Sequence, residues 1–154
     1  MGILTDDMKR LVREQRLGFI ATVCADGTPN LSPKGTTTIW DDDHLVFGDI
    51  RSPQSVQNIE QNPSVEVNVV DPLARKGYRF KGQGIVHRSG DVFQRGCQMY
   101  REMGLRHEIQ AVVLIRVERA LPVFSPAYDR GDTEAQVKER WRRYWQKLWG
   151  GAEK

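Results

Sequence analysis

The residues best suited to chemistry surround Lys34, in a segment rich in hydroxyl groups, residues 32–38. Lys34 supplies a positive charge, and the neighbouring serine and threonines supply hydrogen-bond donors. A second segment, residues 46–55, reads as a strand that runs into a helix start at Ser52 and Pro53. A helix start offers free N–H groups and the positive end of the helix dipole. Side by side, the two segments would bind the phosphate of a phosphorylated cofactor.

Alternation along a strand decides which of these side chains could serve one ligand. A strand running through residues 29–39 would place Ser32, Lys34 and Thr36 on one face. The simpler interpretation is an exposed lysine on a strand edge, with threonines present for their β propensity. The adjacent Gly35 and the nearby helix start favour phosphate contact over that interpretation.

Composition bounds the class of protein. A chain of 154 residues suits one domain with a proper hydrophobic core. The balance of 23 Lys and Arg against 20 Asp and Glu gives too small a net charge to indicate nucleic-acid binding. No apolar run reaches the length of a membrane span, and the acidic N-terminus does not resemble a signal peptide. We therefore expect a cytoplasmic protein without a membrane or nucleic-acid partner.

The cysteines and histidines do not point to a metal site. Cys24 and Cys97 lie far apart on elements of different type, which suits small buried apolar residues better than a disulfide. His44, His87 and His107 form no short metal-ligand pair. Because no hydrolytic constellation stands out either, any enzymatic chemistry would come from a bound cofactor.

The elements that must position the Lys34 segment are short strands joined by turns and helices. Strands are predicted over residues 17–24, 29–39, 44–49, 64–70, 78–87 and 111–117. Helices are predicted over residues 5–15, 52–61 and 91–103. Asp26-Gly27 is a hairpin signal, and Gly82 with Gly84 hints at a bulge. A meander of this kind favours an antiparallel sheet closed into a small barrel.

The tail has a different character, so we divide the chain into a barrel domain, residues 1–126, and a C-terminal segment, residues 127–154. A helix is predicted over residues 133–149, with a capping box from Thr133 and Gln136. Its apolar stripe comprises Val137, Trp141, Tyr144, Trp145 and Leu148. Such a stripe should not stay in water, so we expect it to pack on the barrel or on a partner chain, near the cofactor. The alternative is that the basic residues beside the stripe cover an anionic ligand or membrane headgroups.

The order of the motifs carries a family resemblance. Residues 18–23, 26–29, 32–35, 45–49, 58–63 and 78–82 together resemble the pyridoxamine 5′-phosphate oxidase-like FMN-binding split-barrel family. The similarity spans about residues 5–121. It implies a mainly β fold with flanking helices, a six-stranded antiparallel split β-barrel. It also implies a homodimer with FMN at the interface.

The resemblance further implies which residues hold FMN. Residues 32–37 match the strand at the phosphate and ring edge, Gly48 and Asp49 match the strand facing the isoalloxazine, and Gln54 with Ser55 matches a helix-start phosphate pair. The implied cofactor-binding set is Ser32, Pro33, Lys34, Gly35, Thr36, Thr37, Gly48, Asp49, Ser52, Gln54 and Ser55. In the oxidases proper the helix-start pair is Arg-Lys, so this chain keeps one cation, Lys34.

These points favour an FMN-dependent oxidoreductase that acts on an unidentified small substrate, with no catalytic residue assigned. The oxidases end in a segment that binds the substrate, pyridoxamine phosphate. Residues 122–154 do not match that segment, so we do not expect this substrate. The alternatives are a non-catalytic flavin carrier or sensor and a split barrel that binds F420 or haem.

Overall fold

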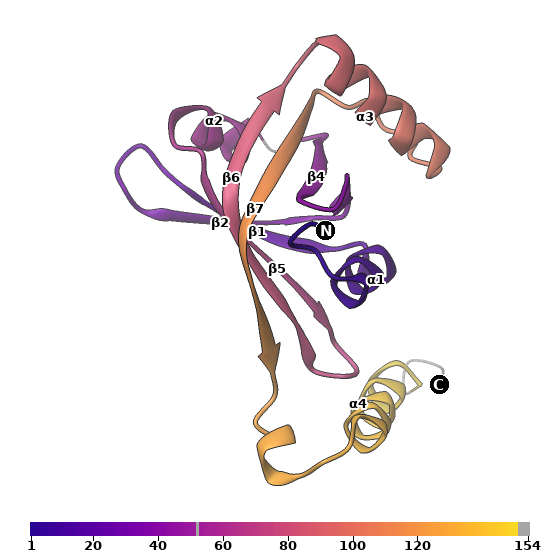
Figure 1. Cartoon of the computed structure of the whole chain (residues 1–154). Coiled ribbons are helices and arrows are strands. Elements are labelled where there is room, and N and C mark those ends of the chain that lie inside the picture. Colours follow the sequence, from indigo (N-terminus) through magenta and orange to yellow (C-terminus); the bar gives the residue numbers. More distant parts are fainter. Residues whose placement is uncertain (52, 151–154) are drawn as a thin grey trace.

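The computed structural model describes residues 1–51 and 53–150, which form one curled antiparallel sheet with flanking helices (Figure 1). The strands in these ranges are β1 Gly18–Val23, β2 Pro29–Lys34, β3 Thr38–Ile39, β4 His44–Asp49, β5 Ser64–Asp71, β6 Lys76–His87 and β7 Ala111–Phe124. The helices are α1 Asp6–Gln15, α2 Pro53–Gln61, α3 Gly90–Glu102, the 3-10 turn η1 Tyr128–Arg130 and α4 Glu134–Trp149.

The two edges of the sheet meet at the Lys34 segment. The hydrogen-bonded strand order is β2-β1-β5-β6-β7-β4-β3, so β2 and β3 lie at opposite edges. Residues 35–37 alone join β2 to β3 along the chain, and so short a link spans at most roughly 15 Å. The sheet must therefore curl until its edges meet. We call this meeting point, residues 34–38, the barrel seam.

The split-barrel fold predicted from the sequence is confirmed, with one difference in strand number. The predicted strand over residues 29–39 is interrupted by a turn at residues 35–37, which divides it into β2 and β3. That division gives seven strands where six were predicted.

Apolar side chains from the strands fill the barrel. Completely buried examples are Ile20, Leu45, Phe47, Val67, Phe80 and Ile115. The longest pairing joins β6 to β7, with a register shift between Lys81 and Gly82. A Cβ on Gly82 would lie 1.9 Å from the carbonyl oxygen of Arg116, so the two backbones approach here because residue 82 is glycine. The predicted irregularity in this strand is therefore present.

The helices occupy different ends of the sheet. α2 and α4 lie at opposite ends in Figure 1, and α3 covers a second apolar cluster that includes Tyr100, Ile109 and Val112. The predicted tail helix is present, and the Thr133–Gln136 capping box forms. In the described ranges, no helix has the length and apolar character to span a membrane.

Candidate functional site

Lys34, the last residue of β2, is a buried cation at the barrel seam. Only 5% of it is exposed. Its ammonium donates a hydrogen bond to the Ser32 hydroxyl at 2.8 Å and lies 5.9 Å from the centre of the Phe47 ring. Burial lowers the pKa of Lys34, and the negative charge of Asp49 opposes this shift without cancelling it. The seam therefore holds a positive charge that an additional anion would stabilise.

Thr36 and Thr37 shape the seam through their hydroxyl groups. The Thr36 hydroxyl donates to the carbonyl oxygen of Gly48 at 2.7 Å and accepts from its N–H at 3.0 Å. The Thr37 hydroxyl donates to the Lys34 carbonyl oxygen at 2.8 Å, and Thr37 is buried. Both hydroxyls thus stabilise the turn that interrupts the predicted strand. Ser32 and Lys34 share one face of β2, whereas the turn directs Thr36 away from that face to β4.

Gly48 in β4 makes room for the protein's own side chains. A Cβ there would lie 2.7 Å from Ile109 Cδ1 and 3.0 Å from Tyr100 Cε2. The Tyr100 ring also lines a cavity of about 370 Å³ beneath α3. The absence of a side chain at residue 48 therefore serves the packing of α3. The next residue, Asp49, is 5% exposed, and its carbonyl oxygen accepts from the Gln110 N–H at 2.8 Å.

The start of α2 carries a network of uncharged polar side chains. Asn30 Nδ2 donates to Ser55 Oγ at 3.4 Å, and Asn58 Nδ2 donates to Thr22 Oγ1 at 2.9 Å. Gln54 Nε2 donates to Asn58 Oδ1 at 2.8 Å. Ser55 and Asn58 are both buried. The side chains of Gln54 and Ser55 are therefore hydrogen-bonded to other residues of the same chain.

Two further members of the predicted set, Pro33 and Gly35, are exposed beside Lys34, and Ser52 lies outside the described residues. The negative charge of Asp49 acts on the ammonium of Lys34. Asp49 also lies four residues before the first residue of α2, so the end of β4 and the start of α2 are close in sequence. The structure thus brings Ser32, Lys34 and Asp49 together.

Sequence reasoning missed the partners that build this site. Thr22, Asn30 and Asn58 form the network at α2, and Tyr100 reaches the seam from α3. One signal was available for the network. Asn58 follows Ser55 by three residues and so shares its helix face.

The sequence profile of the pyridoxamine 5′-phosphate oxidase family matches residues 4–122, and the chain belongs to this family. The family match ends before η1 and α4, so the C-terminal helix lies outside the matched residues.

Individual solved structures support the same fold. HupZ from Group A Streptococcus is similar at 32% identity and a TM-score of 0.73, over 80% of this chain and 96% of HupZ. An FMN-binding protein from Syntrophomonas wolfei shares the fold at 14% identity and a TM-score of 0.66, over 79% of this chain and 87% of that protein. HutZ, the haem storage protein from Vibrio cholerae, shares the fold at 19% identity and a TM-score of 0.62, over 79% of this chain and 94% of HutZ. Among curated proteins, none matches significantly.

Proposed function

We propose that this protein binds FMN at the barrel seam and acts as a flavin-dependent oxidoreductase on a small substrate. The observation that carries the proposal is the buried ammonium of Lys34, whose pKa stays below its usual value despite the charge of Asp49. A phosphate group would add a second negative charge beside the ammonium and would accept charge-assisted hydrogen bonds from it. The family membership agrees with a cofactor of this type.

The residues present fit the phosphate end of such a cofactor. Lys34 and Ser32 would hold the phosphate, and the buried Phe47 ring behind the ammonium keeps water from that side. The hydrogen bonds between Thr36 and Gly48 fix the end of β4 beside it. When bound, FMN supplies hydride and single-electron transfer. The chain's part is to bind and orient it.

We further propose that a second copy of the chain completes the site. Pro33 and Gly35 are exposed at the seam and could contact a partner chain. Such a homodimer would have the two-fold symmetry that is commonest among soluble oligomers.

Haem is the second candidate ligand, because the start of α2 lacks the cations that hold a phosphate in the oxidases proper. The positions that carry Arg-Lys in the oxidases proper are Gln54 and Ser55 here, and their side chains hydrogen-bond to Asn58 and Asn30. Without those cations, phosphate binding rests mainly on Lys34. HutZ, a haem storage protein with the same fold, supports this alternative.

The visible spectrum of the purified protein distinguishes these ligands, before and after titration with FMN, haemin or F420. We expect flavin absorbance and saturation at about one FMN per chain, as for one preformed site. Saturable binding of haemin or F420 without FMN binding would overturn the proposal. Steady-state reduction of bound FMN by a nicotinamide nucleotide, followed by reoxidation by an acceptor, would support an enzyme. A flavin that is not reduced would instead indicate a carrier or sensor.

A further inference from the structure

A crevice separates α4 from the turn that joins β5 to β6, residues 71–76. Its volume is about 560 Å³, within the range of small-molecule sites. Pro72 and Leu73 line it from the turn. The helix contributes Arg142, Trp145, Gln146 and Trp149. Its walls are therefore almost entirely apolar, with two polar side chains, Arg142 and Gln146, among the lining residues.

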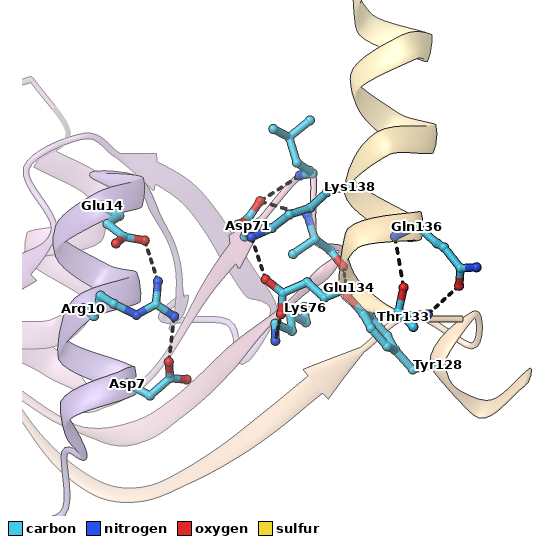
Figure 2. Close-up of polar contacts among 12 residues, drawn as sticks. Asp7, Arg10, Glu14, Asp71, Lys76, Tyr128, Thr133, Glu134, Gln136 and Lys138 are labelled. Atoms are coloured by element: carbon cyan, nitrogen blue, oxygen red, sulfur yellow. Dashed lines mark hydrogen bonds and ion pairs between the residues drawn. The ribbon is translucent and has the colours of Figure 1, made fainter. Parts of the chain in front are cut away.

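Polar contacts at the first turn of α4 fix the helix against this turn (Figure 2). The Tyr128 hydroxyl donates to the Ala74 carbonyl oxygen at 2.6 Å. The Glu134 carboxylate forms ion pairs with Lys76 and, at 2.6 Å, with Lys138. The Tyr128 and Lys76 contacts join the start of the tail to the β5–β6 hairpin, and the Lys138 pair stabilises the first turns of the helix itself.

Apolar and cation–π contacts reinforce this docking. Val137 is completely buried, and the Arg75 guanidinium lies 3.4 Å from the centre of the Trp141 ring. On the opposite wall, the Asp71 carboxylate accepts from the N–H groups of Leu73 and Ala74, at 2.8 and 3.0 Å. The crevice is thus preformed, which reduces the entropic cost of binding a ligand.

The chemistry of the walls indicates the ligand class. The Trp145 and Trp149 rings are stacked, 5.3 Å apart at an interplanar angle of 25°, and present flat aromatic surface. Arg142, which lines the crevice, pairs with the Glu139 carboxylate at 2.9 Å, and the same carboxylate pairs with Arg143 at 2.8 Å. Two guanidinium groups sharing one carboxylate leave net positive charge beside the aromatic wall.

We propose that this crevice is a second binding site, which takes a small planar fused-ring aromatic acid. The rings of the ligand would lie against Trp145 and Leu73, and its acidic group would bind Arg142. The site lies largely on α4, beyond the family match at residues 4–122. The proposal does not depend on FMN binding at the barrel seam.

The test is a calorimetric titration of the full chain with 2-naphthoate, using 2-naphthalenemethanol as the uncharged analogue. Wild type should bind 2-naphthoate saturably, also when FMN is present, and more tightly than the alcohol. Trp145→Ala should weaken binding at least tenfold. Leu73→Asp, which alters the opposite wall and leaves the helix intact, should do the same. Arg142→Gln should reduce the affinity for 2-naphthoate to about that for the alcohol.

Leu148→Ala is the matched control, because Leu148 is 53% exposed on the same helix and does not line the crevice. Its affinity for 2-naphthoate should equal that of wild type. No saturable binding to wild type, or unchanged affinity in both Trp145→Ala and Leu73→Asp, would overturn the proposal. Equal weakening by Leu148→Ala would also overturn it, because binding would then belong to the whole exposed aromatic face.

Discussion

The hydroxyl of Tyr100 donates a hydrogen bond to the carbonyl oxygen of Thr36 at 2.8 Å, across 64 residues of sequence. This contact ties α3 to the barrel seam. The Thr36 hydroxyl in turn bonds both backbone groups of Gly48. The position of the seam beside Lys34 therefore depends on a helix that comes from a distant part of the chain.

Tyr100→Phe should destabilise the protein by about 1 kcal/mol, because the Thr36 carbonyl loses its donor while the ring still fills its place. Denaturant unfolding measures this change. FMN binding should weaken as well, because the seam is less well fixed. Tyr128→Phe is the matched control, since it removes a similar hydrogen bond at the other end of the sheet and should leave FMN binding unchanged. Wild-type stability in Tyr100→Phe would show that the contact contributes nothing.

Gly48→Ala should cost roughly 1–3 kcal/mol of stability, because the new methyl group meets Ile109 and Tyr100 in a filled space. Gly35→Ala is the comparison. The nearest atom to a Cβ at residue 35 is the Arg16 carbonyl oxygen, 3.9 Å away, so this change should be tolerated. Thermal unfolding of the two variants measures the difference. Equal melting temperatures would contradict the packing described for β4 and α3.

The affinity for FMN should depend on the protonation of Lys34. Burial holds the pKa of Lys34 below its usual value of 10.5, and a bound phosphate would raise it again by stabilising the ammonium. The ratio of FMN to riboflavin affinity should therefore be highest at neutral pH and fall as the pH rises through the pKa of Lys34. Lys34→Arg should flatten this profile, because a guanidinium stays charged. A wild-type ratio that is constant up to pH 10.5 would argue against phosphate contact.

The stabilisation that the ion pairs of Glu134 give to α4 should fall in acid. Hydrogen bonds from Lys138 and Lys76 lower the pKa of Glu134 from 4.5 to about 2. A carboxyl group with a lowered folded-state pKa stabilises the fold fully above its unfolded pKa, and this contribution is lost as the pH falls through the folded pKa. The difference in unfolding free energy between wild type and Glu134→Gln should be constant above pH 4.5 and shrink towards pH 2. A difference that does not change across this window would exclude the ion pairs as its source.

Local patterns predicted most of the fold. The Asp26-Gly27 hairpin and the capping box of α4 are both present, because turn and cap residues act over a few positions. The family resemblance then supplied the barrel. What no local pattern contained was the turn at residues 35–37, which is stabilised by Gly48 and Tyr100. Threonines favour strands, so the segment reads as one strand until those distant partners are known.

The candidate site could be predicted only where the local spacing of residues determines it. Ser32 and Lys34 are two residues apart on a true strand, so alternation placed them together. The burial of Lys34 and its proximity to Asp49 depend on closure of the barrel, which sequence spacing does not encode. We expect the tail to pack on the barrel or on a partner chain, near the cofactor. Within the chain, α4 packs on the turn at residues 71–76, at the opposite end of the sheet from α2 (Figure 1). Its place relative to the cofactor stays a prediction.

The most direct test of the account compares FMN and riboflavin binding in wild type, Lys34→Ala and the exposed-lysine control Lys81→Ala. Because riboflavin lacks the phosphate, only FMN should lose a charge-assisted contact in Lys34→Ala, worth roughly 1.5–3 kcal/mol, or about 10- to 100-fold in Kd. Lys81→Ala should bind both ligands as wild type does. Equal weakening of FMN and riboflavin in Lys34→Ala, or no weakening of either, would contradict a phosphate site at the barrel seam.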